Sequence, residues 1–385
     1  MVRHHEAFAT AKQIFHTAAE ATAASFVCDV LRPDFLGFRL TEEIRLPMFI
    51  STFLRYWLRP SFQHLILHVT QHCNLRCEHC FVDFGSGQNL PLEVYQRFGR
   101  DIGPLFWLDI SGGEPFLRHD LADIVLAFDA KVVQIPTNAS FPDAAESQLE
   151  KLRAHSRAKI SVSLSLDGLK TTHEAIRKAP GNWDQVWSTY ERLRALKGIS
   201  VKINTVLTVR NAPEILTLMD QVWERQPDFH SVILLRGEPR RQDLALPRLP
   251  ELRHLAQEVL KRQRRYTYGQ NPLNAYILRN YHRYLWQLSI KTLEERRQII
   301  PCLGGQAHAV CWADGSISSC EMLSPVGNIT EQSWRAIISS PAFLQQVQDI
   351  GAGKCYCTHN CAMLDSILFR PASCFHLLGA CRREF

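Results

Sequence analysis

Short apolar segments alternate with helix-like segments over residues 61–235, and this alternation restricts the fold more than any other feature. The apolar segments, each a strand candidate, lie at residues 65–69, 105–110, 132–135, 160–166, 201–207 and 232–235. Helix-like segments lie between them, at residues 92–103, 120–128, 143–154, 183–197 and 212–225. Strands separated by helices predict a parallel α/β sheet. Such sheets carry functional side chains at the carboxyl ends of their strands.

Three cysteines follow the first strand candidate within eight residues, as Cys73-x3-Cys77-x2-Cys80. A four-iron cluster has four corners, and thiolate sulfur is its usual protein ligand. Three thiolates therefore hold three irons and leave the fourth open to a substrate or cofactor. Zinc is the alternative, but zinc sites favour paired Cys-x-x-Cys units with four ligands. No fourth ligand is evident nearby.

This spacing after the first strand resembles the signature of the radical S-adenosylmethionine (SAM) enzymes, over roughly residues 62–235. The resemblance implies a partial (β/α)6 TIM-like barrel and a 4Fe–4S cluster whose open iron chelates SAM. It also implies reductive cleavage of SAM to methionine and a 5′-deoxyadenosyl radical, which abstracts hydrogen from the substrate. A reducing partner such as flavodoxin or ferredoxin is expected. One departure from the family is His79, where an aromatic residue is more usual.

Residues after later strands match further motifs of that family. Ser111-Gly112-Gly113-Glu114-Pro115 resembles the GGEP motif, which meets the SAM amino group. Glycine permits close backbone approach, and Glu114 can accept a hydrogen bond from an ammonium. Arg177 is the expected partner of the SAM carboxylate, with an exposed helix arginine as the alternative. The implied SAM contacts are Gly112, Gly113, Glu114, Pro115, Asn138, Ser163, Ser165, Arg177 and Asn204.

A second group of cysteines occupies the C-terminal part. Cys302 and Cys320 bracket Gly315 as Cys-x12-Gly-x4-Cys, which resembles the opening of the SPASM and twitch extensions of radical SAM enzymes. Those extensions hold auxiliary 4Fe–4S clusters. The later spacing departs from a full SPASM domain, so one auxiliary cluster is expected. The preferred ligands are Cys302, Cys320, Cys357 and Cys361, with Cys355 as a close competitor. A structural zinc site is the alternative.

The remaining cysteines have weaker interpretations. Cys311, Cys374 and Cys381 either ligate a second auxiliary cluster or are ordinary buried thiols, and Cys28 is expected to be buried filler. The chain carries no segment that reads as an export signal, and its longest apolar stretch near the start is too short to span a bilayer. Clustered cysteines without an export signal indicate a reducing, cytoplasmic location.

Charge is concentrated in one segment. The formal net charge is +6, yet residues 236–300 carry fourteen Lys/Arg against six Asp/Glu. A local basic segment predicts a local anionic partner, and no nucleic acid is expected. Within it, Lys261, Arg262, Arg264 and Arg265 lie near two tyrosines and suit a phosphate or an acidic peptide, although a solvated helix face explains them as well.

These patterns divide the chain into four parts. Residues 1–60 form a helical N-terminal extension, in which 48–60 could rest on a lipid surface as a peripheral contact or pack on the main domain. Residues 61–235 form the radical SAM core, 236–300 a basic helical insertion, and 301–385 a loop-dominated auxiliary-cluster domain with one helix near 331–348.

The predicted function is hydrogen abstraction from a peptide or small-molecule substrate by a radical SAM enzyme. A lipid or another anionic metabolite is the alternative substrate. A non-catalytic iron–sulfur electron carrier or sensor is an alternative of another class, against which the intact residues 112–115 and Arg177 argue. A third possible function is a binding module, stabilised by a zinc ion, that binds an anionic partner through residues 236–300.

Overall fold

The computed structural model describes residues 56, 61–82, 87, 89–269 and 272–379, except for the side chain of Cys374. The predicted helical extension, its lipid-facing stretch (apart from residue 56) and the lone Cys28 and Cys381 lie outside these residues. Among the described residues, no helix combines the length and the apolar character needed to cross a membrane.

Six parallel strands form the core of the fold, in sequence order. They are β1 (His64–His68), β2 (Leu105–Ser111), β3 (Ala130–Thr137), β4 (Lys159–Ser165), β5 (Ile199–Leu207) and β6 (Phe229–Leu234). Each strand pairs in parallel with the next. All six coincide with predicted strands to within three residues at either end. The predicted partial (β/α)6 barrel is therefore confirmed.

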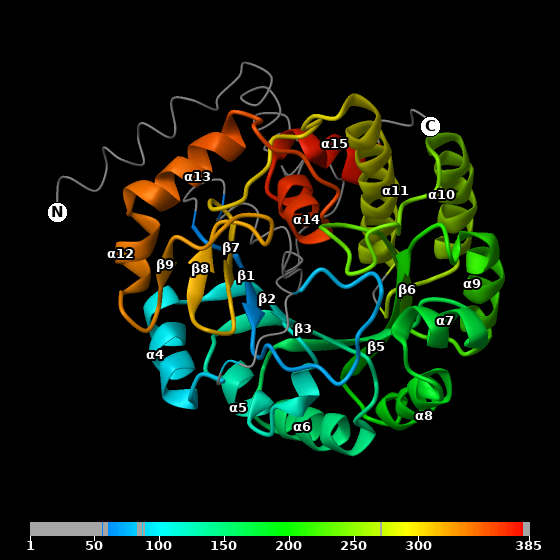
Figure 1. Ribbon diagram of the computed structural model, residues 1–385, viewed down its shortest axis with the longest axis horizontal. Helices are drawn as coiled ribbons and strands as arrows, with labels where there is room; N and C mark the ends of the chain where they lie inside the picture. Colours follow the sequence, from blue (N-terminus) through cyan, green and yellow to red (C-terminus); the bar gives the residue numbers. More distant parts are fainter. Residues whose placement is uncertain (1–55, 57–60, 83–86, 88, 270–271, 380–385) are drawn as a thin grey trace, which may run out of the picture.

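Helices follow each of these strands along the chain. They are α4 (Leu92–Ile102), α5 (Leu121–Leu126), α6 (Pro142–His155), α7 (Lys170–Arg177), α8 (Asn182–Arg194), α9 (Ile215–Glu224), α10 (Leu249–Gln263) and α11 (Pro272–Glu295), with short 3-10 turns at Pro115–Leu117 and Ala212–Glu214. Figure 1 shows α4 to α9 on the outside of the curved sheet and the blue loop after β1 at the centre of the view. That loop carries Cys73, Cys77 and Cys80.

Successive side chains of β1 point to two different faces of the sheet. Leu65 and Leu67 belong to the main hydrophobic core beneath the helices. Since successive side chains of a strand point to opposite faces, His64 and His68 face the other side, the barrel interior. Both histidines are almost completely buried. The interior of the barrel therefore contains polar groups that need partners.

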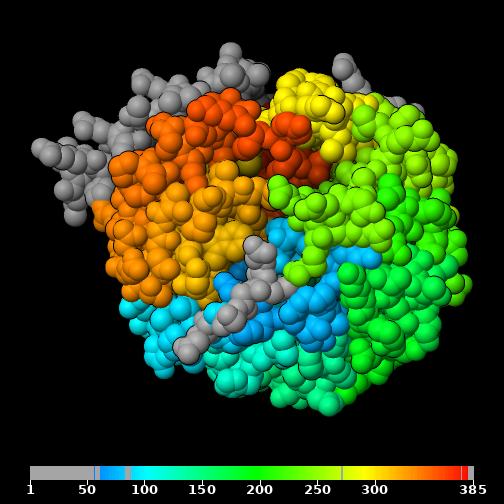
Figure 2. All heavy atoms as spheres, in the orientation of Figure 1, coloured from blue at the N-terminus to red at the C-terminus, as the bar shows by residue number. Residues whose placement is uncertain are grey.

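The C-terminal part continues the same sheet. Strand β7 (His308–Cys311) pairs in parallel with β1, and β8 (Ser316–Ser318) and β9 (Gly327–Asn328) follow antiparallel, giving the order β6-β5-β4-β3-β2-β1-β7-β8-β9. In Figure 2 this part, orange to red, covers the side of the molecule between the cyan and the yellow-green segments. The C-terminal cysteines thus lie beside the first strand of the barrel.

The prediction of one helix near residues 331–348 is wrong in detail. The structure has α12 (Trp334–Ile338) and α13 (Pro341–Gly351), followed by α14 (Asn360–Leu368), a 3-10 turn (Pro371–Ser373) and α15 (Cys374–Leu377). Ser340 begins a new helix because its hydroxyl accepts from the amide of Phe343 at 3.2 Å, and Pro341 cannot continue the preceding one. The region is consequently more helical than its composition predicts.

Candidate active site and cysteine groups

The loop after β1 brings Cys73, Cys77 and Cys80 into one another's electrostatic reach. Cys77 is buried and the other two thiols are half-buried. Burial raises the pKa of Cys77 to about 11, although the nearby Arg177 guanidinium opposes this shift. Three convergent thiols on one short loop are a donor set that suits an iron–sulfur cluster.

Two glycines pack directly against this cysteine loop. A β-carbon on Gly112 would lie 2.4 Å from the carbonyl oxygen of Thr70, and one on Gly113 would lie 1.9 Å from that of His72. Gly112 also has a φ of +112°. The amide of Gly113 donates to the Thr70 carbonyl at 2.9 Å, and that of Glu114 donates to the His72 carbonyl at 2.9 Å. The glycine pair is therefore required by the backbone of the cysteine loop itself.

Glu114 is almost completely buried and accepts hydrogen bonds from residues at the end of the neighbouring strand, β3. Its carboxylate accepts from the hydroxyl of Thr137 at 2.8 Å and from the amides of Asn138 and Phe116 at 2.7 and 3.2 Å. The Asn138 side chain donates to Oδ1 of Asn74, inside the cysteine loop, at 2.8 Å. Glu114 and Asn138 thus tie the ends of β2 and β3 to the cysteine loop.

Arg177 ends α7 and is buried rather than exposed. Its Nε and Nη2 both lie 2.6 Å from Oδ2 of Asp167, a residue that sequence reasoning did not select. Burial alone would raise the pKa of Asp167, but the guanidinium outweighs it and lowers that pKa to about 2. The signal available in the sequence was an Asp-Gly pair directly after the fourth strand.

The other predicted SAM contacts also lie at the carboxyl end of the sheet. Pro115 is buried at the start of a 3-10 turn after β2. Ser163 is buried on β4, and Ser165, half-buried, stands opposite Asn204 of β5 in the strand register. The predicted residues 112–115, 138, 163, 165, 177 and 204 therefore lie in the carboxyl-terminal halves of consecutive strands or in the segments that follow them, as parallel-sheet sites require.

Four C-terminal cysteines line a second site. Cys302, Cys320, Cys355 and Cys357 surround a cavity of about 130 Å³, whereas Cys361 does not line it. Burial raises the pKa of Cys302 to about 12 and that of the other three thiols above its ordinary value. Four thiols around one cavity suit a four-iron cluster or a tetrahedral zinc ion. Cys355, the alternative ligand in the sequence analysis, therefore lies in this group of thiols, whereas Cys361 lies outside the cavity.

A buried charge network lies between the two groups of cysteines. Glu321 contacts Nε2 of His68 at 3.0 Å, Nε2 of His359 at 2.5 Å and the guanidinium of Arg236 at 3.7 Å. Glu321 and both histidines are almost completely buried. These opposite charges lower the pKa of Glu321 despite its burial. Sequence reasoning did not find this network, because its members come from four distant segments.

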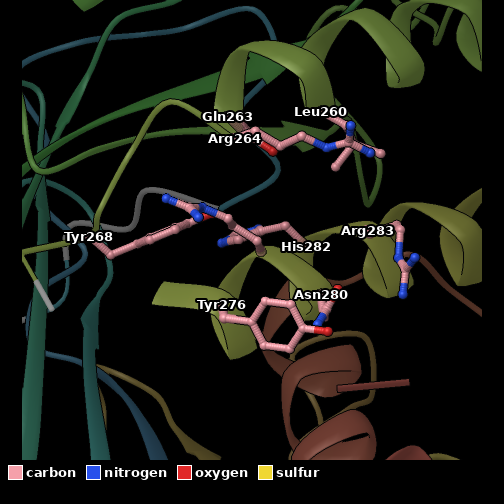
Figure 3. A pocket seen from close by; sticks show the side chains of 9 residues that line it. Leu260, Gln263, Arg264, Tyr268, Tyr276, Asn280, His282 and Arg283 are labelled. Atoms are coloured by element: carbon pink, nitrogen blue, oxygen red, sulfur yellow. The ribbon is translucent and has the colours of Figure 1, made fainter. Parts of the chain in front are cut away.

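The basic residues at the end of α10 divide into two groups. Lys261, Arg262 and Arg265 each pair with a carboxylate of α9 or α10. Arg264 instead lines a cavity of about 260 Å³ between α10 and α11 (Figure 3), together with Leu260, Gln263, Tyr268, Tyr276, Arg279, Asn280, His282 and Arg283. None of these lining residues is a cysteine, so this basic cavity is separate from both groups of thiols.

A family model matches the region that holds the first group of cysteines. The family model of the Radical SAM superfamily matches residues 67–222. The AdoMet-dependent heme synthase of Methanosarcina barkeri is 27% identical over 308 residues, which cover 73% of this chain and 83% of the synthase. The subtilosin biosynthesis protein AlbA of Bacillus subtilis is 23% identical over 293 residues, 73% of this chain and 60% of AlbA.

Solved structures of other proteins have a similar fold. The crystal structure of Streptococcus suis SuiB bound to S-adenosylmethionine superimposes with a TM-score of 0.56 at 18% identity, covering 78% of this chain and 70% of SuiB. At that identity the similarity concerns the fold alone. Apart from the heme synthase, the chain matches less than two thirds of the length of the curated relatives compared with it.

Proposed function

Because this chain belongs to the radical SAM superfamily, whose members use a 4Fe–4S cluster and SAM, we propose that it cleaves SAM reductively and abstracts hydrogen from a peptide substrate. The observation that carries this proposal is the convergence of three thiols on a loop that the glycine pair, Asn138 and the α7 end all contact. The amide of Glu78, inside that loop, donates to the carbonyl of Ile176 at 2.9 Å. The protein's own backbone and side chains thus hold this loop in place.

In this proposal Cys73, Cys77 and Cys80 hold the SAM-binding cluster. When bound, the cluster would supply the one-electron reduction that cleaves SAM and starts hydrogen abstraction from the substrate. The protein's own residues hold the loop, exclude water and orient SAM. Arg177, fixed by Asp167, presents a cation beside the cysteine thiols, where an anionic carboxylate would be attracted. Ser163, Ser165 and Asn204 would offer hydrogen bonds from the neighbouring strand ends.

The C-terminal part would hold one auxiliary 4Fe–4S cluster on Cys302, Cys320, Cys355 and Cys357. This ligand set replaces Cys361 with Cys355, because Cys355 lines the shared cavity and Cys361 does not. Residues 301–385 would thus form the auxiliary-cluster domain. Glu321, next in sequence to the cavity-lining Cys320, contacts His68 at the carboxyl end of β1, where its neighbours hold the carboxylate ionised.

A peptide is the favoured substrate class. AlbA takes part in the biosynthesis of a bacteriocin, SuiB has been solved with its precursor peptide SuiA, and MftC of Mycobacterium tuberculosis is a mycofactocin maturase that is 30% identical over 158 residues. A small-molecule substrate is the second candidate, because the heme synthase match covers most of both chains. A one-electron donor such as flavodoxin or ferredoxin would serve either substrate.

The test is anaerobic. The purified, iron-loaded chain is reduced with dithionite and mixed with SAM, and 5′-deoxyadenosine is measured by mass spectrometry with and without candidate peptides. Wild-type protein and the control Cys311→Ser should form 5′-deoxyadenosine, whereas Cys77→Ala should form none. Cys311 is a fair control because it is buried outside both groups of cysteines. Full activity of the Cys77 variant would refute the proposal.

A further inference from the structure

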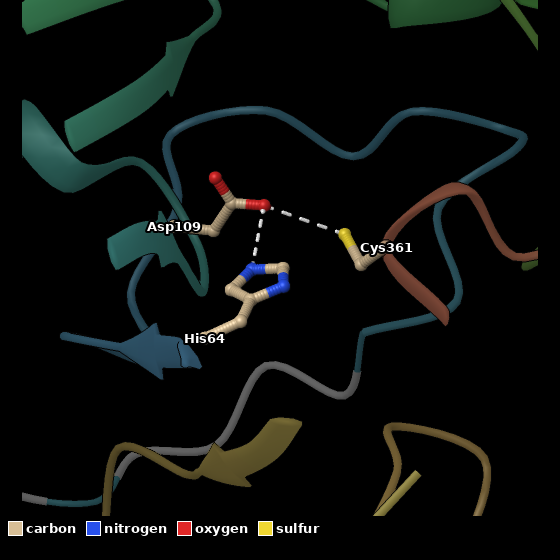
Figure 4. A group of neighbouring side chains, drawn as sticks. All are labelled: His64, Asp109 and Cys361. Atoms are coloured by element: carbon tan, nitrogen blue, oxygen red, sulfur yellow. Dashed lines mark hydrogen bonds and ion pairs between the residues drawn. The ribbon is translucent and has the colours of Figure 1, made fainter. Parts of the chain in front are cut away.

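Cys361, which does not line the auxiliary cavity, faces a different set of side chains in the barrel. Its Sγ lies 3.4 Å from Oδ2 of Asp109 on β2, and the same oxygen lies 3.2 Å from Nε2 of His64 on β1. All three atoms lie within 4.8 Å of one another. Figure 4 shows the imidazole and the thiol pointing at one oxygen of the carboxylate. The three residues come from three elements that are far apart in sequence.

The other atoms of these side chains are already occupied. Nδ1 of His64 lies 2.9 Å from Oδ2 of Asp365, and Oδ1 of Asp109 accepts from the indole N–H of Trp107 at 2.6 Å. If His64 is neutral and donates from Nδ1, its Nε2 presents only a lone pair. That lone pair faces a carboxylate oxygen, which is also an acceptor. Two acceptors at 3.2 Å repel each other unless a proton or a metal ion lies between them.

No donor satisfies Nε2 of His64 within the described residues, although the side chain is completely buried. A buried polar atom without a hydrogen-bond partner costs about 1–3 kcal/mol, and here two further potential ligand atoms stand beside it, a grouping that suits a metal ion. A histidine whose second nitrogen donates to a carboxylate is also the usual arrangement at protein metal sites. Asp365 has this role here, and it contacts Nδ1 of His308 at 2.8 Å as well.

We propose that His64, Asp109 and Cys361 bind a single divalent metal ion, with zinc as the preferred metal. Tetrahedral ligands at ~2.0–2.3 Å from zinc are about 3.3–3.7 Å apart, close to the 3.2 and 3.4 Å separations observed. One carboxylate and one thiolate balance the charge of the ion. Nitrogen, oxygen and sulfur ligands together favour zinc over magnesium or calcium.

Such an ion would join three parts of the fold. His64 and Asp109 lie on adjacent barrel strands, whereas Cys361 is the second residue of α14. The metal would therefore fasten the C-terminal part to the barrel interior. Three protein ligands leave one tetrahedral position for water or another small ligand. This site is independent of the proposed function, because neither the SAM loop nor the four-cysteine cavity contributes a ligand.

The test measures zinc and iron in the full chain, purified anaerobically with its clusters. Wild-type protein and the control Cys311→Ser should carry about one zinc per chain. Asp109→Asn and Cys361→Ser should lower zinc about tenfold or more and leave iron unchanged. Asp109→Asn keeps the oxygen that accepts from Trp107, so the fold should persist, and circular dichroism checks this.

Zinc X-ray absorption on the wild-type protein supplies the second readout. One sulfur and two or three nitrogen or oxygen neighbours would support the site, whereas four sulfurs would place zinc in the four-cysteine cavity and overturn the proposal. An iron loss of about four per chain in Cys361→Ser would make Cys361 a cluster ligand and also overturn it. Wild-type protein without zinc would do the same. None of these outcomes depends on SAM cleavage.

Discussion

Gly112 lies against Thr70 so closely that a β-carbon on the glycine would stand 2.4 Å from the threonine carbonyl oxygen. Gly112→Ala should therefore displace the cysteine loop and remove the iron of the first cluster, about four atoms per chain. Gly103→Ala is the matched control, because Gly103 also has a positive φ but has no atom near its β-carbon position. The iron content of the purified Gly112→Ala and Gly103→Ala variants distinguishes them. Equal iron in both variants would show that the close contact is not needed.

The buried pair of Asp167 and Arg177 should contribute strongly to stability. Breaking a buried pair leaves an uncompensated charge and costs about 3–5 kcal/mol, so Asp167→Ala should lower the melting temperature markedly. The exposed pair of Lys170 and Asp184 is the comparison, since exposed pairs contribute less than about 1 kcal/mol. Thermal unfolding of Asp167→Ala and Asp184→Ala measures the difference. Equal shifts would contradict the structural role of Asp167.

Cys355 and Cys361 should behave differently when replaced. Cys355 lines the four-cysteine cavity, so Cys355→Ala should reduce the auxiliary iron and leave SAM cleavage by the first cluster measurable. Iron content and electron paramagnetic resonance of the reduced protein report both clusters. Cys311→Ser, which alters a buried thiol outside the cavity, is expected to keep all the iron. Retention of the auxiliary signal in Cys355→Ala would return Cys361 to the ligand set.

The alternation of short apolar segments with helix-like segments was sufficient to predict the parallel sheet, and the resemblance to the radical SAM enzymes implied its closure into a partial barrel. The sequence could not predict that β7 joins the barrel beside β1. This strand has four residues, His308–Cys311, and its pairing with β1 spans more than 240 positions. A short strand carries no local signal for so distant a partner. The sequence therefore does not indicate that the strands of the C-terminal part extend the sheet of the barrel.

The cysteine spacing likewise predicted that three thiols gather after β1, and it left the ligands of the second group open. Cys73, Cys77 and Cys80 lie on one loop, so their spacing alone brings them together. In the C-terminal group, the choice between Cys355 and Cys361 depends on where α14 begins, because Cys361 lies in its first turn and faces the barrel. Glu321, His68 and His359 were not predicted for a related reason, since three distant segments supply them.

Acid should destabilise the fold through His230 on β6. The hydroxyl of Thr205 donates to the carbonyl of Leu166 at 2.5 Å and so accepts from Nε2 of His230 at 2.8 Å. Nδ1 of His230 is buried and has no partner among the described residues. Protonation would place a donor there without an acceptor, and burial lowers the pKa of His230 from 6.5 to about 3.

Between those two pKa values the unfolded chain binds the proton more tightly than the folded chain. Stability is therefore fully present above pH 6.5 and is lost as the pH falls toward 3, by an amount on the order of a few kcal/mol. His230→Gln cannot titrate, so its melting temperature should fall less between pH 7 and pH 4.5 than that of the wild type. The exposed His155→Gln, measured in parallel, should follow the wild type because its side chain is in solvent. Identical pH profiles for all three proteins would mean that His230 does not govern the acid response.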